Sequence, residues 1–176
     1  MTRTAGETVR ELVDGVNRLR NGDLSQVDHL ANLYAVDAYV THPFHPEHAN
    51  SATLGRESLR AHFAKVPQAG MSVSSSVADW KLHTTADPEV VIAEFRYEGS
   101  IDQRSLNTRC IFVVRVVAGL IVESRDYIDH LASARAYGML PEVLARISTG
   151  RGHSSTVDRN AVTLGDRRAM GVLRSR

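Results

Sequence analysis

The chain has little of the material from which disulfide-stapled or membrane-spanning proteins are built. It contains a single cysteine, Cys110, so neither a disulfide framework nor a cysteine metal cluster can form within one chain. Its longest apolar runs, residues 110–114 and 116–122, are too short to cross a bilayer, and its first residues lack the apolar region of a signal peptide. We therefore expect a cytoplasmic protein without a membrane partner.

An excess of one charge is also missing. Lysine and arginine total 21 against 20 aspartates and glutamates, and a net charge of +1 creates too weak a field to indicate nucleic acid as a partner. The chain has no glycine-rich loop of the kind that cradles phosphates, and the spacing of His42, His45, His48 and His62 fits no known metal signature. We expect no cofactor and no metal.

What the sequence does contain is the composition of one folded domain. It has 176 residues, of which 43% are hydrophobic and 23% are charged. The tail from 149 to 176 is poor in large apolar residues and rich in Gly, Ser and Arg, which predicts a flexible basic segment after a domain spanning 1–148.

Hydrophobic periodicity divides that domain into helices followed by strands. Apolar residues at helical spacing predict helices over 9–19, from Ser25 to Asp37 and after Gly55, then short ones over 131–137 and 141–147. Alternation and turn signals predict strands over 72–83, 90–99, 108–117 and 120–130. Both faces of the third strand are largely apolar, so we expect it to be central, with a homodimer as one way to cover its outer side.

Several segments carry a resemblance to a known group. They are LRNGD at 19–23, YAVDAYVTHP at 34–43, LGRESLRAHF at 54–63 and AGLIVESRDYIDHLASARAYG at 118–138. With them the chain resembles the SnoaL-like polyketide cyclases of the nuclear transport factor 2-like superfamily. The last segment, with ADPEVVIAEFRYEG at 86–99, is also similar to the phenazine biosynthesis A/B proteins.

The resemblance and the element order imply an α+β fold. In it a curved antiparallel sheet wraps around three N-terminal helices as a cone-shaped, cystatin-like barrel, with a short C-terminal helical extension. A curved sheet of this kind leaves an apolar pocket, which fits a hydrophobic small molecule.

Asp126 is the first candidate for chemistry in that pocket. Strand alternation groups it with Leu120, Val122, Ser124 and Ile128 on the less charged face of its strand. A carboxyl desolvated in such surroundings has a raised pKa, which suits a general acid or base. The alternative is an aspartate at a strand end paired with its neighbours. In the epoxide hydrolases and phenazine proteins of the superfamily, an acid in the matching motif is catalytic, which favours the first interpretation.

Arg96 and Glu98 are the second candidates, because they lie two apart and share one face of their strand. Limonene epoxide hydrolase carries an arginine and an aspartate two apart on the equivalent strand, and these act with the acid of the last strand. The resemblance thus implies that Arg96 stabilises developing negative charge beside Glu98. A solvated face on which Glu94 and Arg96 pair is the alternative.

His42 follows a short strand. Its position is similar to the one at which ketosteroid isomerase carries its proton-shuttling aspartate. A histidine there is suited to moving a proton or holding a water molecule, and a loop histidine bonded to backbone is the alternative. The side chains expected to contact substrate are Tyr39, His62, Trp80, Phe112 and Ser124.

Other positions depart from the isomerase pattern. Gly15 stands where its oxyanion tyrosine is expected, and Phe112 stands near its second acid, so steroid isomerisation is disfavoured. We therefore expect a cofactor-independent cyclase or isomerase acting on a hydrophobic polyketide-like intermediate. An epoxide hydrolase or epoxide-opening cyclase is one alternative, favoured if Arg96, Glu98 and Asp126 converge, and a non-catalytic small-molecule binding protein is another.

Overall fold

A capping box begins the first helix, α1 (Ala5–Arg20), in the computed structural model, which describes residues 2–47, 52–66 and 70–149. The Thr4 hydroxyl accepts a hydrogen bond from the backbone N–H of Glu7, and the backbone N–H of Thr4 donates to the Glu7 carboxylate. The apolar stripe of α1 then buries Val9, Leu12 and Val13 against the sheet and the second helix.

A six-stranded sheet curves around the helices. Its strands are β1 (Tyr34–Thr41), β2 (Ala52–Leu54), β3 (Val73–Thr84), β4 (Val90–Ile101), β5 (Arg104–Val117) and β6 (Leu120–Ile128). Their order is β2-β1-β6-β5-β4-β3, and every neighbouring pair is antiparallel except β1 with β6, which is parallel. The expected α+β architecture with a curved sheet is confirmed, whereas the expectation of a wholly antiparallel sheet is corrected at β1.

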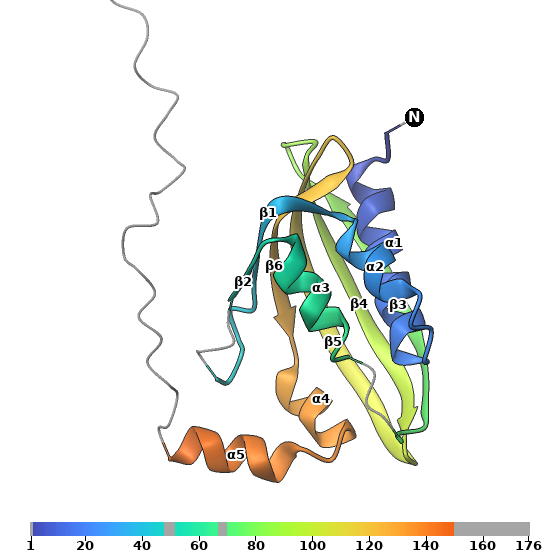
Figure 1. Cartoon of the computed structure of the whole chain (residues 1–176), viewed down its shortest axis with the longest axis vertical. Helices are drawn as coiled ribbons and strands as arrows, with labels where there is room; N and C mark the ends of the chain where they lie inside the picture. The colour runs from blue at the N-terminus through green and yellow to red at the C-terminus, as the bar shows by residue number, and fades with distance from the viewer. Residues whose placement is uncertain (1, 48–51, 67–69, 150–176) are drawn as a thin grey trace, which may run out of the picture.

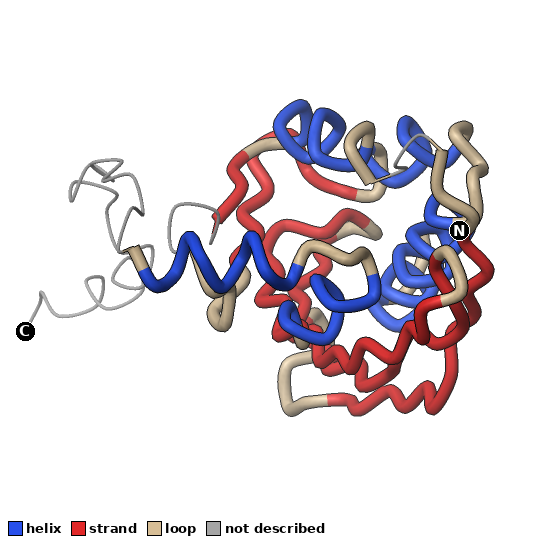
Figure 2. Tube along the Cα trace, turned by 90° about the horizontal axis from the view of Figure 1, so that it is seen from below, coloured by secondary structure: helices blue, strands red, loops and turns tan. Residues whose placement is uncertain are grey.

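The remaining helices lie along the open side and at one end of the sheet. Helices α2 (Gln26–Ala31) and α3 (Arg56–Phe63) lie beside each other across from the long strands, and α4 (His130–Ala136) and α5 (Leu140–Ser148) follow β6 at the lower end (Figure 1). Figure 2 looks into that end, where α4 and α5 lie in front of the space between the sheet and the helices.

The prediction of a helix up to Asp37 is wrong. The second helix ends at Ala31, and the chain enters the sheet at once: the backbone N–H of Ile121 donates to the Leu33 carbonyl, and Tyr34 opposes Ile121. Sheet pairing therefore overrides the helical spacing of these apolar residues.

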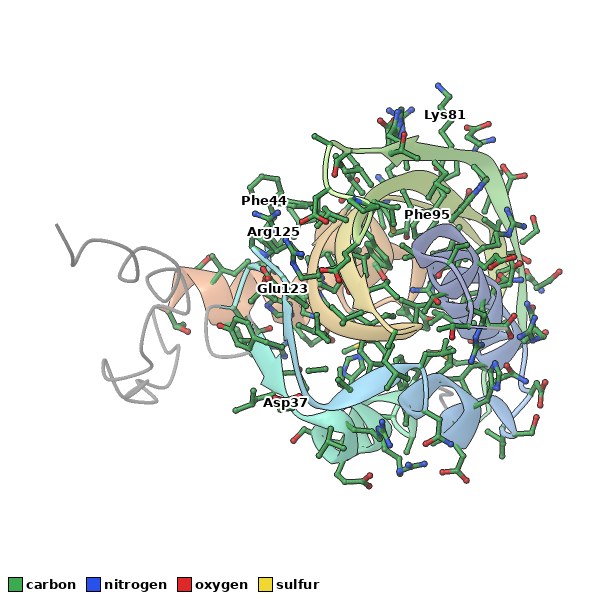
Figure 3. The ribbon with its side chains drawn as sticks, turned by 90° about the horizontal axis from the view of Figure 1, so that it is seen from above. Asp37, Phe44, Lys81, Phe95, Glu123 and Arg125 are labelled. Atoms are coloured by element: carbon green, nitrogen blue, oxygen red, sulfur yellow. The ribbon has the colours of Figure 1, made fainter. Side chains whose placement is uncertain are left out.

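The sheet has an apolar concave face and a polar convex face. On β4 and β5 the buried side chains alternate, with Phe95, Tyr97 and Phe112 inside the curve. Figure 3 looks down the curved sheet and shows Phe95 inside it, near α1, while Lys81 projects outward. The concave face thus carries the core and whatever site the fold encloses.

Strand β6 follows the predicted alternation only in its second half. Ser124 and Asp126 point inward as expected, but a bulge opposite Arg115 and Val116 shifts the strand by one residue. Ile121, rather than Leu120 or Val122, is therefore fully buried in the core. The apolar surroundings predicted for Asp126 come partly from residues other than those expected.

Some expectations lie beyond what the structure tests. Residues 150–176 of the predicted tail and His48 are outside the described residues. The convex face of β5 exposes Ile111 and Val117, and the homodimer stays a prediction. No helix in the described part of the chain is long and apolar enough to span a membrane.

Candidate active site

A single inward-facing carboxyl, that of Asp126, lies on β6. Its side chain is 6% exposed, opposite Phe112 of β5, and the Ser124 hydroxyl donates a hydrogen bond to it. Burial raises the pKa of Asp126 from its ordinary 3.8 to about 7, and the hydrogen bond from Ser124 opposes this shift. Near neutral pH this carboxyl is present both as acid and as base.

Two tyrosines share the interior with Asp126. Tyr34 of β1 and Tyr97 of β4 are both fully buried, and the pKa of each hydroxyl is raised first by burial and further by the negative charge of Asp126. The Tyr97 hydroxyl donates to the Val13 carbonyl. Phe95 packs edge-on against both Tyr97 and Phe112, so the carboxyl is lined by aromatic rings.

Parallel pairing of β1 with β6 brings His42 beside Asp126. Thr41 of β1 opposes Arg125 of β6. Because the two strands are parallel, the next residues along the chain, His42 and Asp126, also lie opposite each other. Burial lowers the pKa of His42 from 6.5 to about 4, three neighbouring histidines add to this, and a hydrogen bond with the Asp126 backbone opposes it. His42 is therefore neutral near pH 7, and its buried Nδ1 has no hydrogen-bond partner in the described residues.

A cavity of about 650 Å³ lies at the end of the sheet next to α4. It is built from the end of α1, the segment after β1, strand β2, the end of α3 and the segment from Ile128 to Met139. Ile128 faces the same side as Asp126 and lines the cavity, so the carboxyl lies one inward position deeper. A volume in this range suits a small organic molecule.

Four histidines surround this cavity, and the sequence indicated only part of the group. Ring centroids of His42 lie 6.4 Å from His45, 6.5 Å from His62 and 5.7 Å from His130, and those of His45 and His130 lie 4.5 Å apart. His130, whose pKa burial lowers to about 4, was missed, although it continues the alternation of Asp126 and Ile128. Within the described ranges no group of three or more His, Cys, Asp or Glu side chains is arranged to hold a metal ion.

Arg20 is the other residue that the sequence analysis missed. It is the last residue of α1, it lines the cavity, and its Cζ lies 4.1 Å from the centroid of the Tyr97 ring. Two of its nitrogens, Nε and Nη1, are buried without a hydrogen-bond partner in the described part of the chain. The signal was available, because Val9, Val13 and Val16 continue to Arg20 at helical spacing on the core-facing side.

The structure brings some of the predicted substrate contacts together and not others. Ser124 and Phe112 adjoin Asp126, and His62 lines the cavity, with a pKa lowered by burial and by Lys65. Tyr39 and Trp80, which were expected to contact the substrate, do not line the cavity. Tyr39 is 47% exposed because alternation on β1 turns Val40 inward instead, and Trp80 packs between Arg10 and Phe95, outside the histidine-lined cavity.

Arg96 and Glu98 share one strand face as predicted, but it is the convex face. Arg96 Nη2 lies 2.7 Å from a Glu98 carboxylate oxygen, and Nε lies 3.1 Å from one of Asp79. The inward positions of β4 belong to Phe95 and Tyr97. Arg96, Glu98 and Asp126 do not converge, so the expectation that Arg96 stabilises charge in the pocket is wrong.

We expect Arg96→Gln to leave the rate of base-catalysed ring opening of 5-nitrobenzisoxazole within about threefold of wild type, because Arg96 lies outside the cavity. The loss of its partly exposed ion pairs should cost about 1 kcal/mol or less of unfolding free energy. Thermal unfolding and steady-state rates measure the two effects. A loss of turnover of about 100-fold would return Arg96 to the site.

The curved α+β sheet is the nuclear transport factor 2-like fold, which this chain shares with an NTF2-like protein from Burkholderia xenovorans (TM-score 0.52, 20% identity, covering 77% of this chain and 97% of its own). The SnoaL-like domain family matches residues 9–124, so the chain belongs to that family.

Similar proteins are found both by sequence and by structure. An uncharacterized PhzA/B-like protein from Pseudomonas aeruginosa is 28% identical over 141 residues, which cover 79% of this chain and 95% of the relative. Among solved structures, a proposed isomerase from Bacillus subtilis has a TM-score of 0.61 at 23% identity, covering 78% of this chain and 97% of its own. A proposed polyketide cyclase from Pseudomonas putida has a TM-score of 0.57 at 17% identity, covering 76% and 98%. At these identities the two structures establish the fold alone.

Proposed function

We propose that this protein is a cofactor-independent acid/base enzyme, a cyclase or isomerase that acts on a hydrophobic polyketide-like intermediate. The observation that carries the proposal is the Asp126 carboxyl, whose pKa of about 7 allows it to accept a proton and return it at neutral pH. Membership of the SnoaL-like family and the likeness to a proposed polyketide cyclase support the substrate class.

In the proposed mechanism the substrate enters through the histidine-lined cavity and places an acidic C–H bond next to Asp126. The carboxylate takes that proton, an enolate forms, and the carboxylic acid returns the proton at another carbon or after ring closure. The hydrogen bond from Ser124 holds the carboxyl in one orientation. Neutral His42 offers Nδ1, a ring nitrogen without a partner in the described residues, to a substrate hydroxyl or a water molecule.

Two other functions are less well supported by the geometry. Epoxide opening by an Arg, Glu and Asp trio required Arg96 and Glu98 to lie in the pocket, and they are on the convex face. A binding protein without turnover would be favoured by an apolar interior without an inward acid, and Asp126 is such an acid.

A carbon acid that is not the natural substrate tests the proposal. Ring opening of 5-nitrobenzisoxazole needs a base to remove one carbon-bound proton as the N–O bond breaks, and the nitrophenolate product is coloured. We expect the wild-type rate above buffer to rise with pH through about 7, because Asp126 must be ionised to act as a base. His42 and His130, with pKa values of about 4, stay neutral across this range. A flat profile from pH 5 to 9 would contradict the proposal.

A further inference from the structure

The Arg20 side chain reaches from the surface helix α1 into the interior. Its guanidinium stacks on the ring of Tyr97, a residue that is 2% exposed, and lines the same cavity as His42 and Ile128. The charge of Arg20 acts on the buried Tyr97 and Cys110, where it lowers both pKa values against the larger effect of burial. A cation is therefore held in the wall of the cavity.

This cation lacks a counter-charge in the described protein. Six of the described arginines form ion pairs with carboxylates, for example Arg10 with Asp14 and Arg115 with Asp87, and Arg20 is not among them. Nε and Nη1 are both buried and unbonded in the described residues. Arg20 as a whole is half-buried, but a buried donor without an acceptor is costly, and two such donors on one guanidinium favour a partner that arrives with a ligand.

The rest of the cavity is also compatible with a negatively charged ligand. Its lining in the described residues contains four histidines, Lys65 at the exposed rim, and no aspartate or glutamate. Nε2 of His130 is also buried without a partner there. The nearest acid inside the fold, Asp126, lies deeper on β6, beyond Ile128.

We propose that Arg20 binds a carboxylate of the substrate, so that the substrate is an aromatic or otherwise apolar carboxylic acid whose acid group is fixed at the Arg20 end of the cavity. A planar carboxylate offers two acceptor oxygens to the guanidinium, a stronger match than a neutral carbonyl or hydroxyl provides. The apolar body lies against the lining residues Val66, Ile128 and Tyr137, and its reacting carbon extends past Ile128 toward Asp126. This assignment rests on the proposed function only in placing the reacting carbon.

Binding of a matched pair of ligands tests the assignment without turnover. We choose 4-phenylbutyrate and 4-phenylbutanamide, which share a shape and differ in charge, and titrate each by calorimetry at pH 8, where His42 and His130 are neutral and Arg20 and Lys65 are the arginine and the lysine of the lining. Wild-type protein should bind the acid about tenfold or more tightly than the amide. Arg20→Gln should reduce that ratio to about twofold or less.

Three further variants separate the explanations. Lys65→Gln removes a charge from the exposed rim of the same cavity and should leave the ratio within about twofold of wild type. Arg20→Lys keeps the charge without the planar fork and should retain part of the preference. Asp126→Asn should keep the preference in full, so a failure of the proposed catalysis is distinguishable from a failure of carboxylate binding.

The unfolding temperature distinguishes a ligand-binding role of Arg20 from a structural one. An arginine retained for a ligand contributes little to the empty protein, so Arg20→Met should unfold at a temperature equal to or above that of wild type. A clear drop in that temperature overturns the assignment. So does wild-type protein that binds neither ligand or binds acid and amide equally, and so does an acid preference that survives Arg20→Gln.

Discussion

Asp126→Asn is expected to lower turnover of 5-nitrobenzisoxazole by about 100-fold or more. Asparagine keeps the size of the side chain and can still accept the hydrogen bond from Ser124, but it cannot take up a proton at neutral pH. The buried surroundings of Asp126 therefore change little while its proton chemistry is lost. Initial rates of nitrophenolate formation at pH 8, where the wild-type carboxyl is ionised, measure the effect.

Asp129 provides the matched control three residues further along. Its side chain is exposed and caps α4 by accepting a hydrogen bond of 2.9 Å from the backbone N–H of Ala132. Asparagine is also a good N-cap, so Asp129→Asn should keep both the fold and turnover within a few fold of wild type. Equal losses in both variants, or a loss only at Asp129, would remove Asp126 from the mechanism.

The same Asp126 variant has a second, independent readout in stability. The pKa of Asp126 rises from 3.8 to about 7 on folding, so wild type loses stability between about pH 4 and pH 7, as the unfolded chain ionises this group and the folded chain holds the proton. At about 1.4 kcal/mol for each pKa unit, the loss amounts to about 4 kcal/mol. Asp126→Asn removes this dependence, so its unfolding free energy relative to wild type should rise by that amount over the window.

The depressed histidines act in the opposite direction in both proteins. His42 and His130, with pKa values of about 4, are protonated in the unfolded chain below pH 6.5 and destabilise the folded state as pH falls. Because both variants carry them, their contribution largely cancels in the difference. A difference that stays constant from pH 4 to pH 8 would show that Asp126 is not desolvated.

Local patterns sufficed for most of the fold. The stripe of α1, the central β5 strand and the helices after β6 follow from periodicity and turn residues, because those signals are local. The β1 strand was misassigned over 34–37, because its partner, β6, lies more than 80 residues away and only that pairing decides its conformation. The bulge in β6 was hidden because strict alternation assumes an unbroken register with β5, and one extra residue between Ile121 and Glu123 shifts that register.

The candidate site was predictable where one residue contrasts with its strand. Asp126 is a lone carboxyl among apolar side chains, and it is buried with a raised pKa, as the alternation indicated. Arg96 and Glu98 lie on a strand whose two faces both contain large side chains, so period-two spacing grouped them without telling which face is concave. Arg20 enters the cavity from the end of α1, where strand alternation says nothing, whereas His130 continues the alternation of Asp126 and Ile128 and was overlooked.

Gly99 is expected to be the most sensitive backbone position of the sheet. It lies in β4 opposite Ser75 of β3, with a φ of 139° that side-chain-bearing residues rarely adopt. A Cβ added to Gly99 would lie 2.0 Å from the carbonyl oxygen of Ser74, which belongs to the backbone of β3 and cannot rotate away. The two long strands can approach this closely only because no side chain lies between them.

Gly99→Ala should therefore lower the unfolding free energy by about 3 kcal/mol or more, from backbone strain together with the clash. For a domain of this size the unfolding temperature should fall by roughly 6–12 °C. Gly22→Ala isolates the strain, since Gly22 has a φ of 97° but nothing lies within 4 Å of an added Cβ; it should cost only about 1 kcal/mol. Differential scanning calorimetry measures both variants, and equal losses at Gly22 and Gly99 would show that β3 and β4 move apart at little cost.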